Sequence, residues 1–229
     1  MKLTKLIITN FRGYKNRTEV GFNDITTFVG KNDSGKSTIL EALDIFFNDG
    51  KGCIKIDNQD INIENKNGND TDIAIEACFT DLPAEIVIDA SNKTSLKNEY
   101  LLNDDGTLHI EKIFPNASSK AKVYIIAKHP NNPNCNDLMQ LKIADLKKKV
   151  KELNIEDKVT DKTVSAAFRA AIWSYYDHEE GLSLANRKID VSKGEPNLSG
   201  NKLKNIFPFT RCFNLIGATA ILIMKYRIH

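Results

Sequence analysis

The segment that most constrains the fold is FVGKNDSGKSTILEALDIFF, residues 28–47. An apolar run ends at its start, a loop with two glycines follows, and residues 37–47 then carry apolar side chains at helical spacing. Residues 30–37 match the pattern G-x-x-x-x-G-K-[ST], known as Walker A. The pattern fixes few positions and therefore also occurs by chance. The strand-like run before it and the amphipathic run after it favour a phosphate-binding loop.

The residue types of this loop suit the binding of a nucleotide. Glycines let the backbone wrap closely around phosphate oxygens, and the helix N-terminus adds its dipole. Lys36 supplies a charge for the β- and γ-phosphates, and the Ser37 hydroxyl is a ligand for Mg²⁺. We therefore expect ATP and Mg²⁺ as cofactors. The expected contact residues of the loop and the first helical turn are Gly30, Asn32, Asp33, Ser34, Gly35, Lys36, Ser37 and Thr38.

Alternating, β-branched segments predict strands around this loop. The expected strands are residues 2–11, 17–22, 25–30, 72–82 and 120–129, and a hairpin is expected over 99–114 around Asn-Asp-Asp-Gly. Residues 25–30 are apolar enough to suit a buried position. From about residue 136 to 180 the apolar spacing is helical. The sequence therefore predicts an α/β fold, with a mixed β-sheet around the helix that follows the loop and a helical segment after it.

Changes of character along the chain predict three parts. Residues 1–135 form the lobe that carries the loop, residues 136–211 begin a helical insertion, and residues 212–229 form a tail. The tail is rich in apolar residues but has no turn chemistry or caps that place it in the fold. We expect it to be mobile or poorly packed.

Two motifs together resemble the ATP-binding heads of the SMC, RecF and OLD (overcoming lysogenization defect) group. They are Asn10-Phe11-Arg12-Gly13-Tyr14 and the loop itself, which has Asn32 in the form G-x-N-x-S-G-K-S. The resemblance is strongest over residues 1–50, where OLD-type ATPases are nearest. It extends over residues 70–130 and is weak beyond them. It implies an ABC/SMC-type P-loop ATPase lobe linked to DNA metabolism or phage defence, in a parent family that is often an ATP-dependent endonuclease with a Toprim domain.

The resemblance also implies roles for individual residues and partners. Arg12 would lie near the nucleotide phosphates, and the alternative is a solvated arginine in a turn. Asn32 and Asp33 line the loop, and in head dimers such residues can face the opposing subunit. A homodimer or larger assembly, formed through the heads or the helical segment, is therefore expected. DNA is a candidate partner of the full-length parent.

ATP hydrolysis in this group needs two further motifs, which this sequence does not supply plainly. The first is an apolar strand that ends in Asp-Glu, the Walker B motif. Asp89 follows the apolar residues 86–88 but precedes Ala90, so the catalytic carboxylate is missing. The second is a Ser-Gly-Gly-like signature helix. Residues 197–202, NLSGNK, resemble a fragment of it but have Asn201 in place of the second glycine.

Other candidates for these roles have little support. Gln59 and Gln140 are weak candidates for a γ-phosphate-sensing glutamine, and Asp57 and Asp60 fit a solvated loop better than a Mg²⁺ site. The function therefore stays open between the N-terminal part of an ATPase, a nucleotide-binding regulatory or adaptor module without hydrolysis, and an inactive remnant. Residues 202–209 resemble the point where OLD-type chains return to the second half of the head. We expect a truncated or frameshifted product, and the alternative is a short natural protein whose partner supplies the rest.

Composition excludes little. The net charge of +2 argues neither for nor against nucleic acid. A lysine-rich run over residues 144–153 fits a solvated helix face better than a DNA contact, and Phe168, Ile172 and Tyr175 fit a packing or dimer face. The spacing of the cysteines suits neither a zinc site nor disulfides and indicates reduced thiols. They are Cys53, Cys78, Cys135 and Cys212. No apolar run is long enough to span a membrane and no signal peptide is evident, so a cytoplasmic protein is expected.

Overall fold

The computed structural model describes residues 1–30, 35–89, 92–179, 181–191, 210–216 and 219–225. The chain divides into two compact units that are interleaved along the sequence. The first unit comprises Met1–Asp81, Ile110–Lys122 and Leu203–His229, and the second unit comprises Leu82–His109 and Val123–Lys202. The boundary expected at residue 135 does not coincide with a boundary of these units. The chain passes to the second unit after Asp81, back to the first after His109, and to the second again after Lys122.

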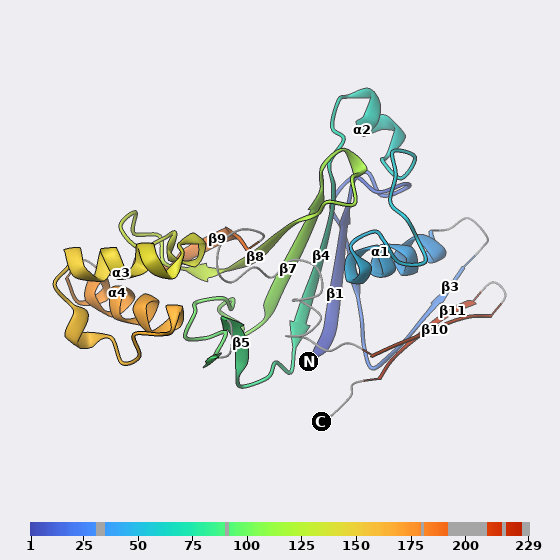
Figure 1. Ribbon diagram of the computed structural model, residues 1–229. Coiled ribbons are helices and arrows are strands. Elements are labelled where there is room, and N and C mark those ends of the chain that lie inside the picture. The colour runs from blue at the N-terminus through green and yellow to red at the C-terminus, as the bar shows by residue number, and fades with distance from the viewer. Residues whose placement is uncertain (31–34, 90–91, 180, 192–209, 217–218, 226–229) are drawn as a thin grey trace. The chain divides into compact units, whose positions relative to one another are not determined.

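The main sheet of the first unit has the strand order β2-β1-β4-β7. Figure 1 labels β1, β4 and β7, which run side by side. Its strands are β1 (Lys2–Thr9), β2 (Thr18–Gly21), β4 (Ile73–Thr80) and β7 (Leu108–Phe114). β1 pairs antiparallel with β2 on one side and with β4 on the other, so that Ile7 lies opposite both Glu19 and Glu76. Leu6 and Ile8 of β1 are fully buried. Burial of these β-branched and aliphatic side chains places the core of the unit against this sheet.

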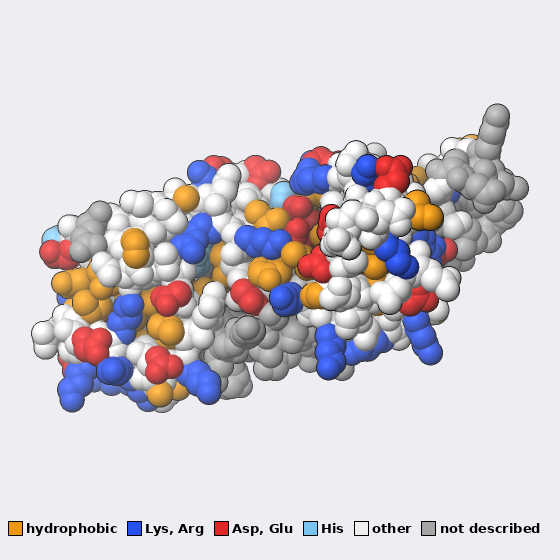
Figure 2. Space-filling view, turned by 90° about the horizontal axis from the view of Figure 1, so that it is seen from above, with side chains coloured by type: hydrophobic (Ala, Val, Ile, Leu, Met, Phe, Trp, Pro, Cys, Tyr) orange, Lys and Arg blue, Asp and Glu red, His pale blue; other side chains and the backbone are white. Residues whose placement is uncertain are grey.

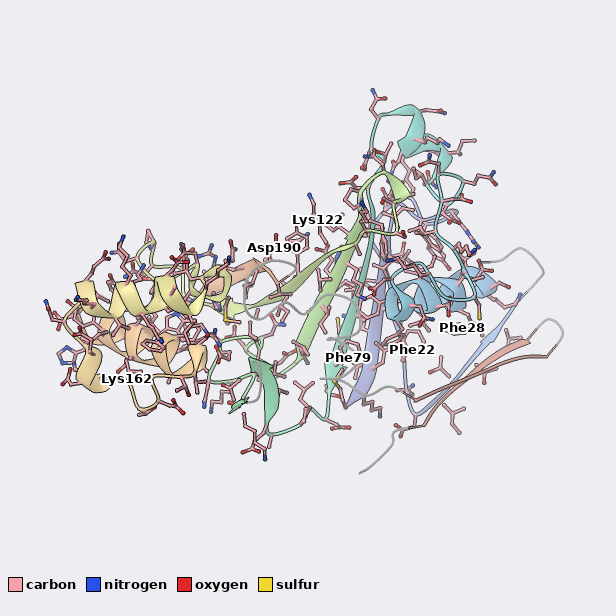
Figure 3. All side chains as sticks on the ribbon, viewed as in Figure 1. Phe22, Phe28, Phe79, Lys122, Lys162 and Asp190 are labelled. Atoms are coloured by element: carbon pink, nitrogen blue, oxygen red, sulfur yellow. The ribbon has the colours of Figure 1, made fainter. Side chains whose placement is uncertain are left out.

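Helix α1 (Lys36–Asn48) packs against β4. Phe46 and Phe47 of the helix contact Phe79 of β4, with ring centroids 6.4 and 6.5 Å apart, and Figure 3 labels Phe79 beside the helix. The helical spacing of residues 37–47 therefore predicted both the helix and its buried face, which is confirmed. Two shorter elements complete this part, namely α2 (Ile63–Asn67) and the 3₁₀ turn η1 (Pro115–Ala117).

Strand β3 (Ile25–Val29), which precedes the loop, lies in a separate three-stranded sheet of order β10-β11-β3. Its neighbours are β11 (Thr219–Lys225) and β10 (Thr210–Ile216). The pairing is antiparallel, and β11 runs alongside all of β3. Residues 212–216 and 219–225, which belong to the tail that was expected to be mobile or poorly packed, thus lie in paired strands. Non-local backbone pairing places them, and no local turn signal announces it.

The expectation that β3 is buried is also wrong. Ile25 and Val29 are 69% and 78% exposed, whereas Phe28 is half-buried and meets Phe22 edge to face, with ring centroids 6.0 Å apart (Figure 3). Alternate residues of a strand point to opposite faces. One face of β3 is therefore partly covered, and the other carries exposed apolar side chains.

The second unit contains strands and two longer helices. Its elements are β5 (Ile86–Asp89), β6 (Asn92–Thr94), β8 (Lys122–His129), η2 (Leu138–Gln140), α3 (Ile143–Glu152), η3 (Glu156–Lys158), α4 (Ser165–Glu179) and β9 (Ala185–Asp190). Helices α3 and α4 confirm the helical character predicted for residues 136–180. The hairpin expected over 99–114 is only half present: β7 forms, but residues 99–107 form turns.

A buried ion pair lies in the core of the second unit. The Arg169 guanidinium binds both carboxylate oxygens of Glu99, at 2.7 and 3.0 Å, and both side chains are almost fully buried. The Thr94 hydroxyl donates to the same carboxylate at 3.0 Å. These donors compensate the loss of hydration that burial of the carboxylate imposes. The pair connects α4 to the turns that replace the expected hairpin strand.

Helix α4 has a buried apolar face and helix α3 has an exposed lysine-rich face, as the sequence predicts. Phe168 and Ile172 are buried within the unit, which confirms a packing role for them, and Tyr175 is half-buried. Three lysines of α3, at positions 147, 148 and 151, are exposed, and Lys148 lies 3.8 Å from Glu152. Figure 2 shows positive and negative side chains interspersed on the face in view. Within the described residues, no helix is both long and apolar enough to cross a membrane.

His129 makes the stability of the second unit depend on pH. Burial lowers its pKa from 6.5 to about 4, against the effect of the Tyr100 carbonyl, to which Nδ1 donates at 2.9 Å. Between those pKa values the unfolded chain binds a proton that the folded chain does not. We expect the free energy of unfolding to fall by up to about 3 kcal/mol as the pH drops from 6.5 to 4.

Urea titrations across this pH range measure the effect. His129→Asn is the control, because Asn keeps a donor for the Tyr100 carbonyl but does not titrate. The variant should lose much of the pH dependence. An identical pH dependence in both chains would show that His129 is not its source.

Candidate functional site

The candidate site lies between the end of β3 and the start of α1. Gly35 is the N-cap of α1, and its φ of 82° is in the left-handed region that favours glycine. Among the described residues, no side chain caps the helix, and no acidic residue lies in its first turn. The helix dipole at this end therefore stays available to an anion. The expected contact residues Asn32, Asp33 and Ser34 lie outside the described residues, whereas Gly30, Gly35, Lys36, Ser37 and Thr38 are described.

The Lys36 side chain contacts the residue at the start of the loop. Its ammonium group donates a hydrogen bond to the Gly30 carbonyl at 2.8 Å, so the lysine connects the start of the loop to the first residue of α1. Ser37 is exposed, and Thr38 is half-buried. A cation, a hydroxyl group and a helix N-terminus in one place form a donor set that fits a phosphate chain and a magnesium ion.

Arg12 lies beside α1 and is held by two carboxylates. Its Nε donates to Asp60 Oδ1 at 2.7 Å, and its Nη1 pairs with Glu41 of α1. Partial burial lowers the pKa of Arg12, but the two carboxylates outweigh this effect and raise it overall, so the side chain stays cationic. Arg12 thus lies in a turn, as the alternative interpretation has it, but its side chain is paired with two carboxylates. Its expected position near phosphates stays a prediction.

Asp60 does not lie in a solvated loop, contrary to the expectation. Its side chain is 8% exposed, accepts from Arg12, and also accepts from the Asp57 backbone N–H at 3.0 Å. The Asp57 carboxylate is turned to its own loop, where it accepts from the Gln59 N–H at 2.6 Å. Both carboxylates thus have local partners. Sequence spacing could not reveal the Arg12 pairing, because it joins residues 48 positions apart.

Tyr14 is a further residue at the site, which the sequence placed in a motif without assigning it a role. Its hydroxyl lies 3.4 Å from the Gly35 carbonyl oxygen. A Cβ atom on residue 35 would lie 2.9 Å from the same hydroxyl. Partial burial raises the pKa of Tyr14, so the hydroxyl keeps its proton at neutral pH. Both the backbone conformation and this contact require glycine at position 35.

Of the weaker candidates from the sequence, Asp89 and Gln140 belong to the second unit. Asp89 ends β5, which pairs with β6 in a two-stranded sheet. Gln59 and Gln140 are exposed, and residues 197–202 lie outside the described residues. The whole sequence contains no Asp-Glu dipeptide. The Walker B pair that the resemblance implies is therefore absent from this chain as a contiguous motif.

Substitution of Gly35 by alanine tests the local geometry. The left-handed conformation costs an alanine about 1–2 kcal/mol, and the Tyr14 contact adds to this. Gly106→Ala is the matched control, because Gly106 has a φ of 75° but nothing within 4 Å of its added Cβ. Urea unfolding should show a larger loss of stability for Gly35→Ala than for Gly106→Ala. Equal losses would contradict the close contact with Tyr14.

Residues 1–225 match the family described as AAA ATPase domain. The chain is similar to an uncharacterized protein of Methanocaldococcus jannaschii, with 38% identity over 114 residues, which are 49% of this chain and 31% of that protein. It is also similar to the chromosome partition protein Smc of Halobacteriovorax marinus, with 50% identity over 44 residues, which are 19% of this chain and 4% of that protein.

Among solved structures, the SMC head domain from Thermotoga maritima aligns with 84% of this chain and 66% of its own, at 13% identity and a TM-score of 0.31. The alignments with the two curated relatives cover less than a third of the length of each. The family match, by contrast, spans nearly all of this sequence. The chain therefore belongs to the AAA ATPase domain family.

Proposed function

We propose that this chain binds ATP, together with Mg²⁺, at the loop between β3 and α1. The observation that carries the proposal is the Lys36 ammonium group, which lies 2.8 Å from the Gly30 carbonyl at the N-terminus of α1, where Gly35 is the N-cap. A phosphate oxygen is a stronger acceptor for an ammonium group than a backbone carbonyl, because it is charged. Membership of an ATPase domain family supports the same conclusion.

Each residue of the loop has a role in this proposal. Lys36 neutralises the β- and γ-phosphates, and the backbone N–H groups of residues 30–38 donate to phosphate oxygens. The Ser37 hydroxyl holds Mg²⁺, and Thr38 reaches the α-phosphate. Mg²⁺, when bound, bridges phosphate oxygens and reduces their charge. Asn32, Asp33 and Ser34 line the loop, and Asn32 and Asp33 can face a second subunit.

We further propose that the chain is the N-terminal, ATP-binding part of an SMC-, RecF- or OLD-like protein linked to DNA metabolism or phage defence. The motifs at residues 10–14 and 30–37 support this assignment, as does the similarity to a chromosome partition protein. Such a protein works as a homodimer or larger assembly, and its DNA contact belongs to the full-length form. Arg12, which approaches α1 through Glu41, is proposed to lie close to the bound phosphates.

A second candidate function is a nucleotide-binding module that does not hydrolyse ATP. The observation that favours it is the lack of an Asp-Glu dipeptide, together with the local partners of Asp57 and Asp60. Phosphoryl transfer needs a positioned water molecule and compensation of charge on the equatorial oxygens. A loop that only binds phosphate stabilises the substrate and the transition state about equally, and this does not raise turnover.

Nucleotide binding is tested with Lys36→Ala. The lysine makes charge-assisted contacts to phosphate, so its loss should weaken MgADP binding by about tenfold or more in calorimetric titrations. Lys162→Ala is the matched control, because Lys162 is an exposed lysine of the second unit (Figure 3). Ser37→Ala should instead reduce the gain in affinity that Mg²⁺ provides. Equal affinities of wild type and Lys36→Ala would refute the assignment of the loop.

Turnover separates the two candidate functions. We expect the purified chain to bind ATP and yet to release phosphate no faster than the Lys36→Ala variant, with or without DNA, because it lacks the water-positioning carboxylate. A phosphate-release assay at saturating MgATP measures this. Steady turnover that Lys36→Ala abolishes would reveal a catalytic carboxylate in this chain. Substitution of Asp57, Asp60 and Asp89 to Asn would then locate it.

A further inference from the structure

Residues 10–14, here called the brace, form a turn that is fixed by buried polar contacts. Asn10 is 1% exposed, and its amide group donates to the backbone carbonyls of Asp70 and Asp72 at 2.9 and 3.0 Å. Its side-chain oxygen accepts from the Asn62 N–H at 3.2 Å. Buried amides with several partners hold a segment in one conformation, because each broken contact would leave a polar group without water.

The brace has a second anchor at Arg12. The Arg12 N–H donates to the Asp60 carbonyl at 2.6 Å, and the Asn62 amide donates to the Arg12 carbonyl, also at 2.6 Å. Both Asn10 and Arg12 have a positive φ, 56° and 49°. Such conformations cost free energy for residues other than glycine and persist where the surrounding contacts impose them. The segment is thus held in a strained shape, which is a feature of functional sites.

The brace contacts the start of α1 through Tyr14. The Gly35 carbonyl accepts the helical hydrogen bond from the Ile39 N–H at 3.3 Å, and the Tyr14 hydroxyl approaches the same oxygen at 3.4 Å. In a trans peptide the carbonyl of Gly35 and the N–H of Lys36 point in opposite directions. A second donor on that carbonyl therefore fixes the direction of the Lys36 N–H. This N–H points away from the helix at its N-terminal end.

We propose that Tyr14 is a positioning residue for the phosphate-binding loop, whose hydroxyl orients the Gly35–Lys36 peptide so that the Lys36 N–H faces a bound phosphate. This inference rests on the proposed nucleotide binding. The 3.4 Å separation is longer than an ordinary O–H···O hydrogen bond, and hydrogen bonds at such sites often tighten when the ligand is bound. The tyrosine also limits the space beside Gly35, because a Cβ atom on that residue would come within 2.9 Å of the Tyr14 hydroxyl.

Tyr14→Phe tests the inference by removing one oxygen atom. Titrations with MgADP and with inorganic triphosphate compare the wild type, Tyr14→Phe and Tyr175→Phe. Tyr175→Phe is the matched control, because Tyr175 is a half-buried tyrosine of the second unit. We expect Tyr14→Phe to weaken both ligands by the same factor, about three- to tenfold, and Tyr175→Phe to change neither. The amide resonance of Lys36 in the MgADP complex should also shift in Tyr14→Phe.

The outcomes are separable. If the wild type binds neither ligand, the proposed nucleotide binding itself fails. A second outcome is that the wild type binds and Lys36→Ala does not, which supports the nucleotide site. If Tyr14→Phe then binds both ligands like the wild type, with an unchanged Lys36 resonance, only the role of Tyr14 is refuted. Weaker binding of MgADP alone would mean that Tyr14 contacts the nucleoside, and this would also overturn the inference. A lower melting temperature of nucleotide-free Tyr14→Phe, with no shift of the Lys36 resonance, would refute positioning in favour of a merely structural role.

Discussion

The first unit depends on how helix α1 is fixed at both ends. At its C-terminus, Asp49 pairs with Lys112 of β7, whose side chain is 1% exposed and lies 5.1 Å from the centroid of the Phe46 ring. A buried ammonium group loses its hydration, and a close carboxylate and an aromatic face help to compensate that loss. Removal of the Asp49 carboxylate would take a charged partner from the buried ammonium group and is therefore expected to destabilise the unit. This pair therefore fixes the helix relative to its sheet.

Contacts also hold the N-terminal end of α1, and they do not neutralise the positive end of its dipole. Arg12 reaches Glu41, which lies beyond the first turn, and Tyr14 reaches the Gly35 carbonyl. Neither contact places a carboxylate at the N-terminus, so the dipole and the Lys36 charge can both act on an anionic ligand. An uncapped helix end is ordinarily a loss of stability. Here the packing of Phe46 and Phe47 on Phe79 offsets this loss and allows the end to serve as a binding site.

The sequence predicted the parts of this arrangement that depend on local order. The strand, loop and helix around Lys36 follow from glycine spacing and from a 3.6-residue period, both of which are local signals. The partners of Arg12 could not be predicted, since Glu41 and Asp60 lie 29 and 48 residues away and nothing in their neighbourhood marks them. The burial of Lys112 was equally hidden, because a lysine in an alternating strand ordinarily indicates a solvent-facing position.

Strand prediction failed where the pairing came from distant parts of the chain. β9 has the polar sequence ANRKID and was not predicted, but Ile189 lies opposite Ile125 of β8, which supplies the apolar contact. The tail shows the same effect, because Ile221 lies opposite Thr27 across almost the full length of the sequence. Conversely, Tyr100 and its neighbours have strand-like composition but form turns, and Tyr100 has a positive φ of 53°. Strand propensity reflects the surface against which a segment packs, and that surface is unknown from the segment alone.

The fixed position of helix α1 bears on the proposed binding of nucleotide. Because the brace and the Lys112 pair hold α1 in place before any ligand arrives, binding requires little reorganisation at this end of the helix, which favours affinity. A helix end that is fixed in advance gives by itself no preference for the transition state over bound ATP, because it interacts with both about equally. Any acceleration must come from groups brought to the loop after binding. In the proposed function, the loop holds the nucleotide, and hydrolysis depends on the groups that approach the loop.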